Sequence, residues 1–131
     1  MISDTIGDLI IRLKNAGMVK HATISVPFSM MKMAVAEKLQ EAGYVTAVEK
    51  RGKKVRKTLD ITLKYDAAGK SVIHDVKRVS KPGRRLYYGV REIKPVRYGH
   101  GTLVLSTPKG IKTDKEARTE GVGGEALFQI W

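Results

Sequence analysis

The sequence contains no cysteine, which excludes disulfide bridges and thiolate metal sites. Its three histidines, His21, His74 and His100, are far apart and lack the spacing of metal ligands, so we expect no metal or other cofactor. No apolar run is long enough to cross a bilayer, and the N-terminus has no signal-peptide hydrophobic region. We therefore expect a soluble cytoplasmic protein that does not associate with membranes.

Acidic residues are scarce: the chain has 13 Asp and Glu and 25 Lys and Arg, which gives a formal net charge of +12. Residues 1–65 hold 12 basic and 6 acidic residues, and residues 66–131 hold 13 and 7, so each half carries +6. This even distribution excludes a basic tail that merely tethers the protein. Nucleic acid is the commonest polyanion that such a charge would meet. A basic protein with solvated lysines and no ligand is the alternative.

The sequence also lacks the patterns of a catalytic site. Ser106 and Thr107 have no histidine nearby in sequence, and no nucleophile elbow or paired carboxylates are present. The glycine-rich stretch 121–124 lacks the Lys-Ser/Thr of a phosphate loop, and a tight turn with close backbone approach to a partner explains it better. We expect neither an enzyme nor a small-molecule substrate.

The N-terminal half alternates helices and strands. Apolar residues at helical spacing predict an amphipathic helix over residues 3–16 that ends at Gly17. A strand over 23–27 leads to Ser29, which is placed to cap a helix over 30–42 that ends at Gly43. The inward stripe of this helix is predicted to be Met31, Val35, Leu39 and Ala42.

Two alternating strands follow, over residues 44–49 and 59–65. The segment between them is strongly basic, with six Lys or Arg among residues 50–57. It is either a solvated hairpin tip or an arm that grips phosphates, and the overall charge favours the arm. Such an arm would add affinity and salt dependence rather than sequence choice.

Residues 66–69 predict a turn and a boundary between two small domains. Beyond it, residues 72–79 predict a strand, and residues 85–88 a returning strand after the Lys81-Pro82-Gly83-Arg84 turn, with Gly83 at positive φ. Because side chains alternate along a strand, only one of Tyr87 and Tyr88 should be available for RNA, beside the cations Lys81, Arg84 and Arg85.

Residues 89–98 predict an irregular connection that includes about one helical turn. The run Leu103-Val104-Leu105 predicts a buried strand, followed by a hydroxyl-rich turn over Ser106–Gly110 and then a helix. Thr113 and Glu116 have capping-box spacing, which places this helix at about 114–120, with Gly121 as its end. Glu125 is either an ordinary exposed acid, or a carboxylate that orients neighbouring cations or accepts a hydrogen bond from a base edge or a ribose hydroxyl. Residues 126–131 predict a closing apolar strand in which Trp131 is packed.

Together these patterns predict an α+β fold of two small domains. Residues 1–66 would form an N-terminal domain in which strands follow each of two helices. Residues 67–131 would form a C-terminal, mainly antiparallel β domain with one short helix.

The C-terminal motifs resemble a known family. Ser106-Thr107-x-x-Gly110, Thr113-Asp114, Ala117-Arg118 and Gly121-x-Gly123-Gly124-Glu125 are similar to the signature of the bacterial small-subunit ribosomal protein eight family. The likeness extends over the first helix, residues 26–29, residues 59–65 and residues 78–83. The family usually reads Ser-Thr-Ser at the turn, and Pro108 stands at the third position here.

The resemblance implies a structural constituent of the small ribosomal subunit, in the cytoplasm. It implies a primary rRNA-binding protein that docks on a central-domain stem of small-subunit ribosomal RNA, aids assembly and contacts neighbouring ribosomal proteins. Specific recognition would fall to Ser106, Thr107, Gly110, Tyr87 and Glu125, and phosphate contacts to Lys109, Lys81, Arg84, Arg85, Arg12, Asn15, Lys32, Lys53 and Lys54. The alternative is a non-specific double-stranded nucleic-acid-binding architectural protein, which charge alone would support.

Overall fold

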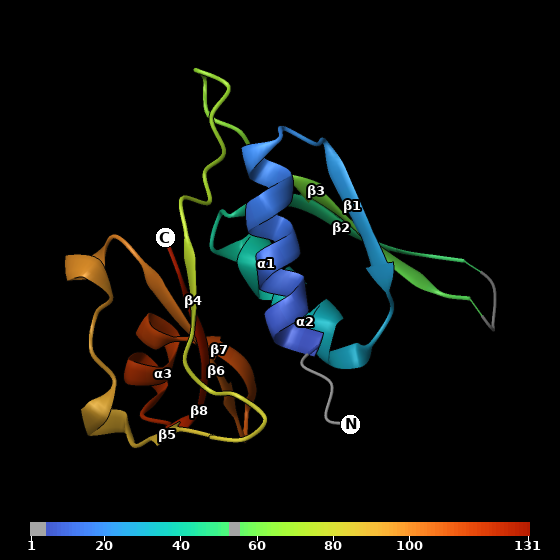
Figure 1. Ribbon diagram of the computed structural model, residues 1–131. Coiled ribbons are helices and arrows are strands. Elements are labelled where there is room, and N and C mark those ends of the chain that lie inside the picture. The colour runs from blue at the N-terminus through green and yellow to red at the C-terminus, as the bar shows by residue number, and fades with distance from the viewer. Residues whose placement is uncertain (1–4, 53–55) are drawn as a thin grey trace. The chain divides into compact units, whose positions relative to one another are not determined.

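The computed structural model describes residues 5–52 and 56–131 (Figure 1). By their contacts, residues 8–74 form one compact unit and residues 75–131 belong to a second. Helices α1 to α3 and two antiparallel sheets confirm the α+β class. The domain boundary at residues 66 and 67 stays a prediction.

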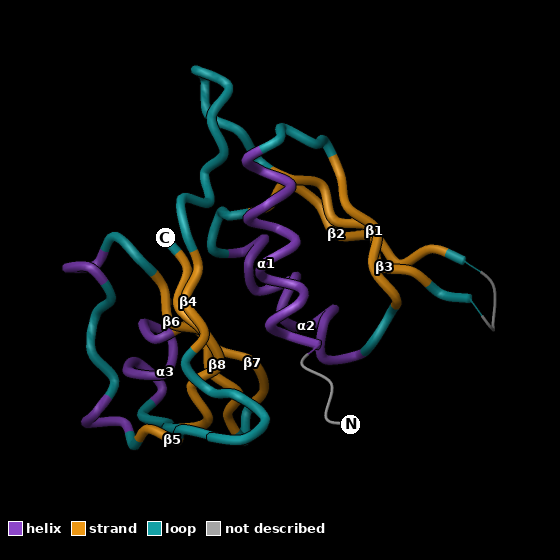
Figure 2. Tube along the Cα trace, viewed as in Figure 1, coloured by secondary structure: helices purple, strands orange, loops and turns teal. Residues whose placement is uncertain are grey.

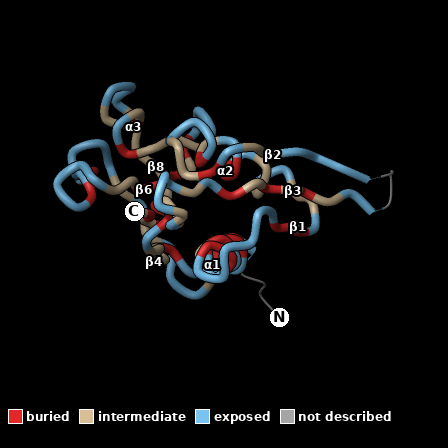
Figure 3. The backbone as a smooth tube through the Cα atoms, turned by 90° about the horizontal axis from the view of Figure 1, so that it is seen from above, coloured by how far each residue is buried: buried red, intermediate tan, exposed pale blue. Residues whose placement is uncertain are grey.

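Among the residues described, the first unit contains α1 (Thr5–Met18) from Asp8 onward, β1 (Thr23–Pro27), α2 (Met30–Glu41), β2 (Val45–Arg51) and β3 (Thr58–Leu63). The sheet order is β1-β3-β2, both pairs antiparallel, so the predicted β2–β3 hairpin is confirmed. Buried residues, red in Figure 3, come from both helices and all three strands. They include Leu9, Ile10, Leu13, Val35, Leu39, Ile24, Val26, Leu59 and Ile61.

The predicted end of the first helix at Gly17 is wrong. α1 continues to Met18, and Lys20 takes the left-handed conformation with φ 59°. The amide of His21 donates to the Ala16 carbonyl at 2.9 Å and that of Lys20 to Gly17 at 3.3 Å, which is a Schellman ending. Gly17 serves packing instead, because a Cβ there would lie 2.6 Å from the Ser71 hydroxyl oxygen.

The second helix has its predicted cap but a different inward face. The Ser29 hydroxyl accepts the Lys32 amide at 3.1 Å, and Gly43 follows the helix with φ 89°. Val35 and Leu39 are buried as expected, and Ala36 joins them. The places predicted for Met31 and Ala42 are wrong, since both are exposed, so the buried face is narrower than the periodicity indicated.

The second unit contains β4 (Val76–Arg78), β5 (Tyr87–Tyr88), β6 (Thr102–Thr107), β7 (Gly110–Thr113), α3 (Asp114–Glu120) and β8 (Gly124–Ile130). Its sheet has the order β4-β8-β6-β7, and β5 also pairs with β8 (Figure 2). One buried cluster lies between α3, the segment from Ile93 to Val96, and the Leu103 and Leu105 face of β6. Short 3₁₀ turns at Val90–Glu92 and Arg97–Gly99 complete this unit.

The α3 helix follows its sequence signals closely. The Thr113 hydroxyl accepts the Glu116 amide at 3.2 Å, and the Glu116 carboxylate accepts the Thr113 amide at 3.0 Å. Gly121 ends the helix with φ 68°. The predicted turn-to-helix connection is wrong in one respect, because residues 110–113 first return along β6 as β7. Only Ile111 is apolar there, so hydrophobic alternation does not reveal this strand.

The predicted strand over residues 72–79 is shortened to Val76–Arg78. Only its start is bound elsewhere, since the Val72 amide donates to the Lys64 carbonyl at 3.2 Å and the preceding Ser71 forms a bridge with Tyr65. The predicted turn over 66–69 is confirmed, with the Gly69 amide donating to the Asp66 carbonyl at 3.0 Å.

Candidate nucleic-acid interface

Strand β8 is the element that places the candidate residues. On one edge it pairs with β6, and on the other it pairs with β4 and then β5. Val76 lies opposite Ile130, and Tyr87 lies opposite Glu125 further along the same strand. The predicted hairpin between residues 72–79 and 85–88 is therefore wrong. Both segments run in one direction along a shared partner, and residues 81–85 loop out between them.

Ser80 closes this loop, which we call the basic loop (residues 81–85). Its side chain is buried, at 3% exposure, and its hydroxyl accepts the Leu86 amide at 2.9 Å and donates to the Leu86 carbonyl at 3.2 Å. The Ser80 amide donates to the Ala126 carbonyl at 3.0 Å. The Ala126 amide in turn donates to the Leu86 carbonyl at 2.9 Å. One side chain thus fixes where the chain leaves β8 and where it returns.

The basic loop is a tight turn with its cations outside. The Lys81 and Arg84 backbones exchange hydrogen bonds of 2.9 Å in both directions. The positive φ predicted for Gly83 is wrong, because its φ lies outside the left-handed region. Lys81, Arg84 and Arg85 are all exposed, so their charges are available to a polyanion.

Tyr87, Glu125 and Ser106 form a row across three adjacent strands. Glu125 is in register with Tyr87 on one side and with Ser106 on the other, and directly opposed residues in antiparallel pairs share a face. Tyr87 is 66% exposed, whereas Tyr88 is partly buried and packs against the buried cluster, so the two rings lie on opposite faces of the strand as alternation predicted. No hydrogen bond within the described part of the chain engages the Ser106 side chain.

Two glycines let the strands carrying this row come together. A Cβ on Gly124 would lie 2.2 Å from the Ser106 carbonyl oxygen, and one on Gly123 would lie 2.4 Å from that of Tyr88. Backbone atoms cannot move aside as a side-chain tip can. The close approach expected of this glycine-rich stretch is therefore made to β5 and β6 of the same chain.

The electrostatics of the row are set by arginines around one acid. The Glu125 carboxylate, with 14% of its side chain exposed, lies 3.4 Å from the Arg85 guanidinium. Arg78 donates through Nε to the Ser80 carbonyl at 2.9 Å. Burial lowers the pKa of Arg78, while the charge of Glu125 acts in the opposite direction. Glu125 thus orients a cation, which was one of its two predicted roles.

The hydroxyl-rich turn is the two-residue loop of the β6–β7 hairpin, with Thr107 opposite Gly110. The Thr107 hydroxyl donates to the Gly110 carbonyl at 2.7 Å and accepts the Lys109 amide at 3.2 Å. Thr107 is only 9% exposed, whereas Pro108, Lys109 and Gly110 are exposed. Thr107 shapes the turn, and Ser106 presents the more available hydroxyl.

The predicted residues of the N-terminal unit lie apart from this row in sequence and on other elements. Arg12 and Asn15 are exposed one turn apart on α1. The Lys32 ammonium donates to the Pro27 carbonyl at 3.1 Å, which holds its charge near the start of α2. Lys53 and Lys54 fall outside the described residues.

Ser80 is the residue of this site that sequence reasoning did not select. It directly precedes the Lys81-Pro82-Gly83 turn, and a buried hydroxyl at the base of a loop is a signal only once its partner is known. Within residues 5–52 and 56–131, no group of His, Asp or Glu is arranged to hold a metal ion. No helix described here is long and apolar enough to span a membrane.

Comparisons with known proteins agree over the whole chain. The family described as ribosomal protein S8 matches residues 4–131. The small ribosomal subunit protein uS8 of Dictyoglomus thermophilum is 49% identical over 131 residues, covering 99% of this chain and 98% of that protein. The protein of the same name from Acidovorax sp. is 47% identical over 129 residues, and that from Mycoplasmopsis pulmonis is 44% identical over 131, each with 98% of the relative covered.

Proposed function

Because the chain belongs to the ribosomal protein S8 family, we propose that it is a constituent of the small ribosomal subunit and binds ribosomal RNA there. In finer detail, it is a primary rRNA-binding protein that docks on a stem in the central domain and aids assembly. The observation that carries this proposal is the row of Tyr87, Glu125 and Ser106, flanked by the basic loop and by Lys109.

The charges around the row supply affinity. Lys81, Arg84 and Arg85 of the basic loop and Lys109 at the hairpin tip are exposed cations on either side of it. Contacts of such cations to phosphates depend on salt and carry no sequence information. They bring an RNA helix to the sheet and leave discrimination to the row.

The row supplies groups that suit RNA. The Ser106 hydroxyl donates and accepts, so it can pair with a ribose 2′-hydroxyl or a base edge in the shallow minor groove. The exposed Tyr87 ring offers a face for an unpaired base or a ribose. Glu125 lies between them and accepts a donor from RNA while it holds Arg85.

Thr107 and Gly110 act through the shape of the turn. The Thr107 hydroxyl both donates and accepts inside the hairpin, which holds the Lys109 amide in place. Gly110 has φ 104°, a conformation that other residues rarely adopt. Together they present Pro108 and Lys109 to the RNA in a fixed arrangement.

The test compares the affinity for a central-domain stem with that for a scrambled duplex of equal length, over a range of salt. Ser106→Ala is expected to weaken cognate binding by about 1–3 kcal/mol without changing the salt slope. Lys81→Ala with Arg84→Ala should weaken binding to both duplexes and flatten the slope by roughly 0.7–0.9 for each phosphate that the variant no longer neutralises.

Equal binding to both duplexes that disappears with salt would refute specific recognition. It would favour the non-specific architectural protein instead. If Ser106→Ala flattened the salt slope as the double variant does, the division between recognition and charge would be wrong.

A further inference from the structure

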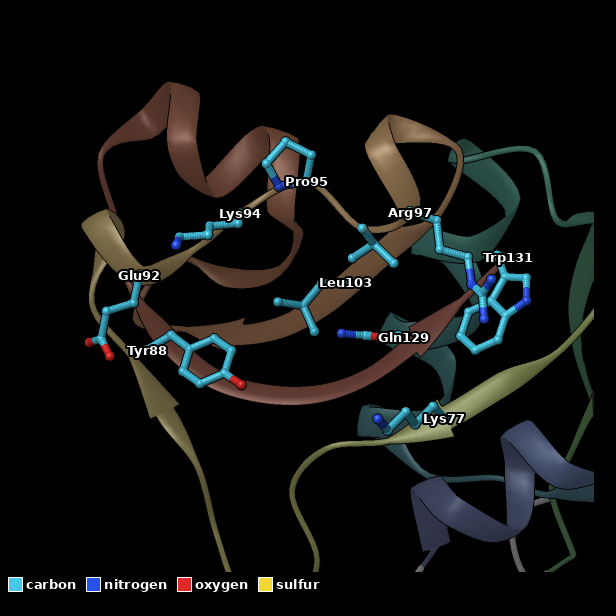
Figure 4. A pocket seen from close by; sticks show the side chains of 10 residues that line it. Lys77, Tyr88, Glu92, Lys94, Pro95, Arg97, Leu103, Gln129 and Trp131 are labelled. Carbon is cyan, nitrogen blue, oxygen red and sulfur yellow. The ribbon is translucent and has the colours of Figure 1, made fainter.

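A pocket of about 420 Å³ lies in the second unit (Figure 4). Its volume is in the range of sites that bind small ligands, roughly 300–1,000 Å³. Tyr88 stands at one end and the Arg97 and Trp131 pair at the other, with Leu103 and Gln129 between them. The remaining lining comes from Lys77, Glu92, Lys94, Pro95 and Val96.

The pocket opens on the face of the sheet opposite to the row. Lys77 is in register with Gln129, and Gln129 with Leu103. Along β6, Leu103 and Leu105 face the buried cluster under α3, whereas Ser106 alternates with Leu105 and faces the other way. A ligand in the pocket would therefore not compete with one on the row.

The walls combine positive charge with flat rings. Lys77, Lys94 and Arg97 place three cations around the pocket, and their summed charge favours an anion there. Glu92 is the acid of the lining, and its carboxylate accepts the Gly89 amide at 2.9 Å. The Gln129 amide can both donate to and accept from the edge of a base.

The aromatic end is held in place by an unusual backbone. The Arg97 guanidinium lies 3.9 Å from the centre of the Trp131 ring, a cation–π contact. Arg97 and Tyr98 have φ values of 47° and 57°, and two consecutive non-glycine residues in this region are uncommon. The Gly99 and Gly101 amides both donate to the Val96 carbonyl, at 2.9 and 3.0 Å, and fix the turn.

We propose that this pocket binds one unpaired nucleotide of an RNA strand, with its phosphate on the lysines and its base against the Tyr88 or Trp131 end. An acidic peptide would use the cations but not the rings, and a duplex would not present a base to the pocket. The inference rests on the proposed RNA-binding function and extends it: the protein holds two RNA segments, one on each face of its sheet.

Trp131 is the single tryptophan of the chain, so its fluorescence reports on the pocket. Titration of the full chain with a single-stranded tetraribonucleotide is expected to change this signal saturably, and to do so equally when a duplex stem occupies the row. Lys94→Gln should weaken the effect roughly tenfold. Lys115→Gln removes the same charge from an exposed position on α3 and should leave it unchanged.

The proposal is overturned if the signal does not change, or if Lys94→Gln and Lys115→Gln behave alike. It is also overturned if an abasic ribose-phosphate tetramer or a tetraglutamate peptide binds as tightly, since the rings would then have no role. Failure here leaves the proposed function standing as long as the duplex stem still binds and Ser106→Ala weakens it. Loss of both activities would overturn the proposed function itself.

Discussion

Replacing the buried Ser80 with alanine tests how the basic loop is held. The substitution removes the two hydrogen bonds that its hydroxyl makes to the Leu86 backbone, at 2.9 and 3.2 Å. The Leu86 carbonyl keeps a partner, because the Ala126 amide donates to it at 2.9 Å. The Leu86 amide loses the only partner that the structure gives it in the described part of the chain.

The loss of stability comes from the Leu86 amide, since, among the residues described, the Leu86 carbonyl keeps a partner and the amide does not. A donor left without a partner in a buried site costs about 1–3 kcal/mol, and the partial exposure of Leu86 places the value in the lower half of that range. We therefore expect Ser80→Ala to lower the free energy of unfolding of the second unit by about 1–2 kcal/mol. Binding to the cognate stem should weaken as well, because Arg85 and Tyr87 are placed by the return of the chain at Leu86.

Urea unfolding followed by Trp131 fluorescence measures this change, since the single tryptophan lies in the same unit. Thr119→Ala is the control within the same unit, because it removes a hydroxyl from an exposed position on α3. It should change stability by less than about 0.5 kcal/mol. A Ser80→Ala variant as stable as the Thr119→Ala variant would refute the view that Ser80 closes the loop.

Gly124→Ala should destabilise the second unit by about 2–3 kcal/mol, because its Cβ would lie 2.2 Å from the Ser106 carbonyl oxygen. Gly83→Ala is its control, with nothing within 4 Å, and should be neutral or slightly stabilising in the same urea unfolding assay; equal effects would contradict the close approach. Thr107→Val keeps the shape but loses both turn hydrogen bonds, so it should speed amide hydrogen exchange at Lys109 and weaken stem binding, with a flatter salt slope because the Lys109 phosphate contact is no longer fixed. Unchanged exchange would show that the hydroxyl does not hold the turn.

Signals that act within a few residues predicted much of this fold. The Ser29 cap, the Thr113 and Glu116 capping box and the left-handed Gly121 all occur as their spacing indicates. Strand alternation also predicted that only one of Tyr87 and Tyr88 faces outward, and the resemblance identified it as Tyr87, which the structure exposes. Each of these features depends on groups that are close in sequence, so no knowledge of long-range pairing is needed.

Pairing between distant segments was the main source of error. The Lys81-Pro82-Gly83-Arg84 turn is present, but it folds out from one edge of β8 rather than joining two strands to each other. A turn motif defines the local bend and does not identify the strand on which the flanking residues pair. Thr107 was misjudged for a different reason: its hydroxyl partner, the Gly110 carbonyl, is only three residues away, but the sequence of β7 carries no hydrophobic alternation that would reveal the β6–β7 hairpin.

In the proposed function, pairing along the shared edge of β8 orders the row before RNA binds. Tyr87 lies on a strand of two residues, which is too short to hold a position by its own pairing. It is fixed instead by Ser80 on one side and by the close packing of Gly123 under the Tyr88 carbonyl on the other. The cost of ordering this strand is therefore met in folding and not in binding, which leaves more of the contact energy for affinity.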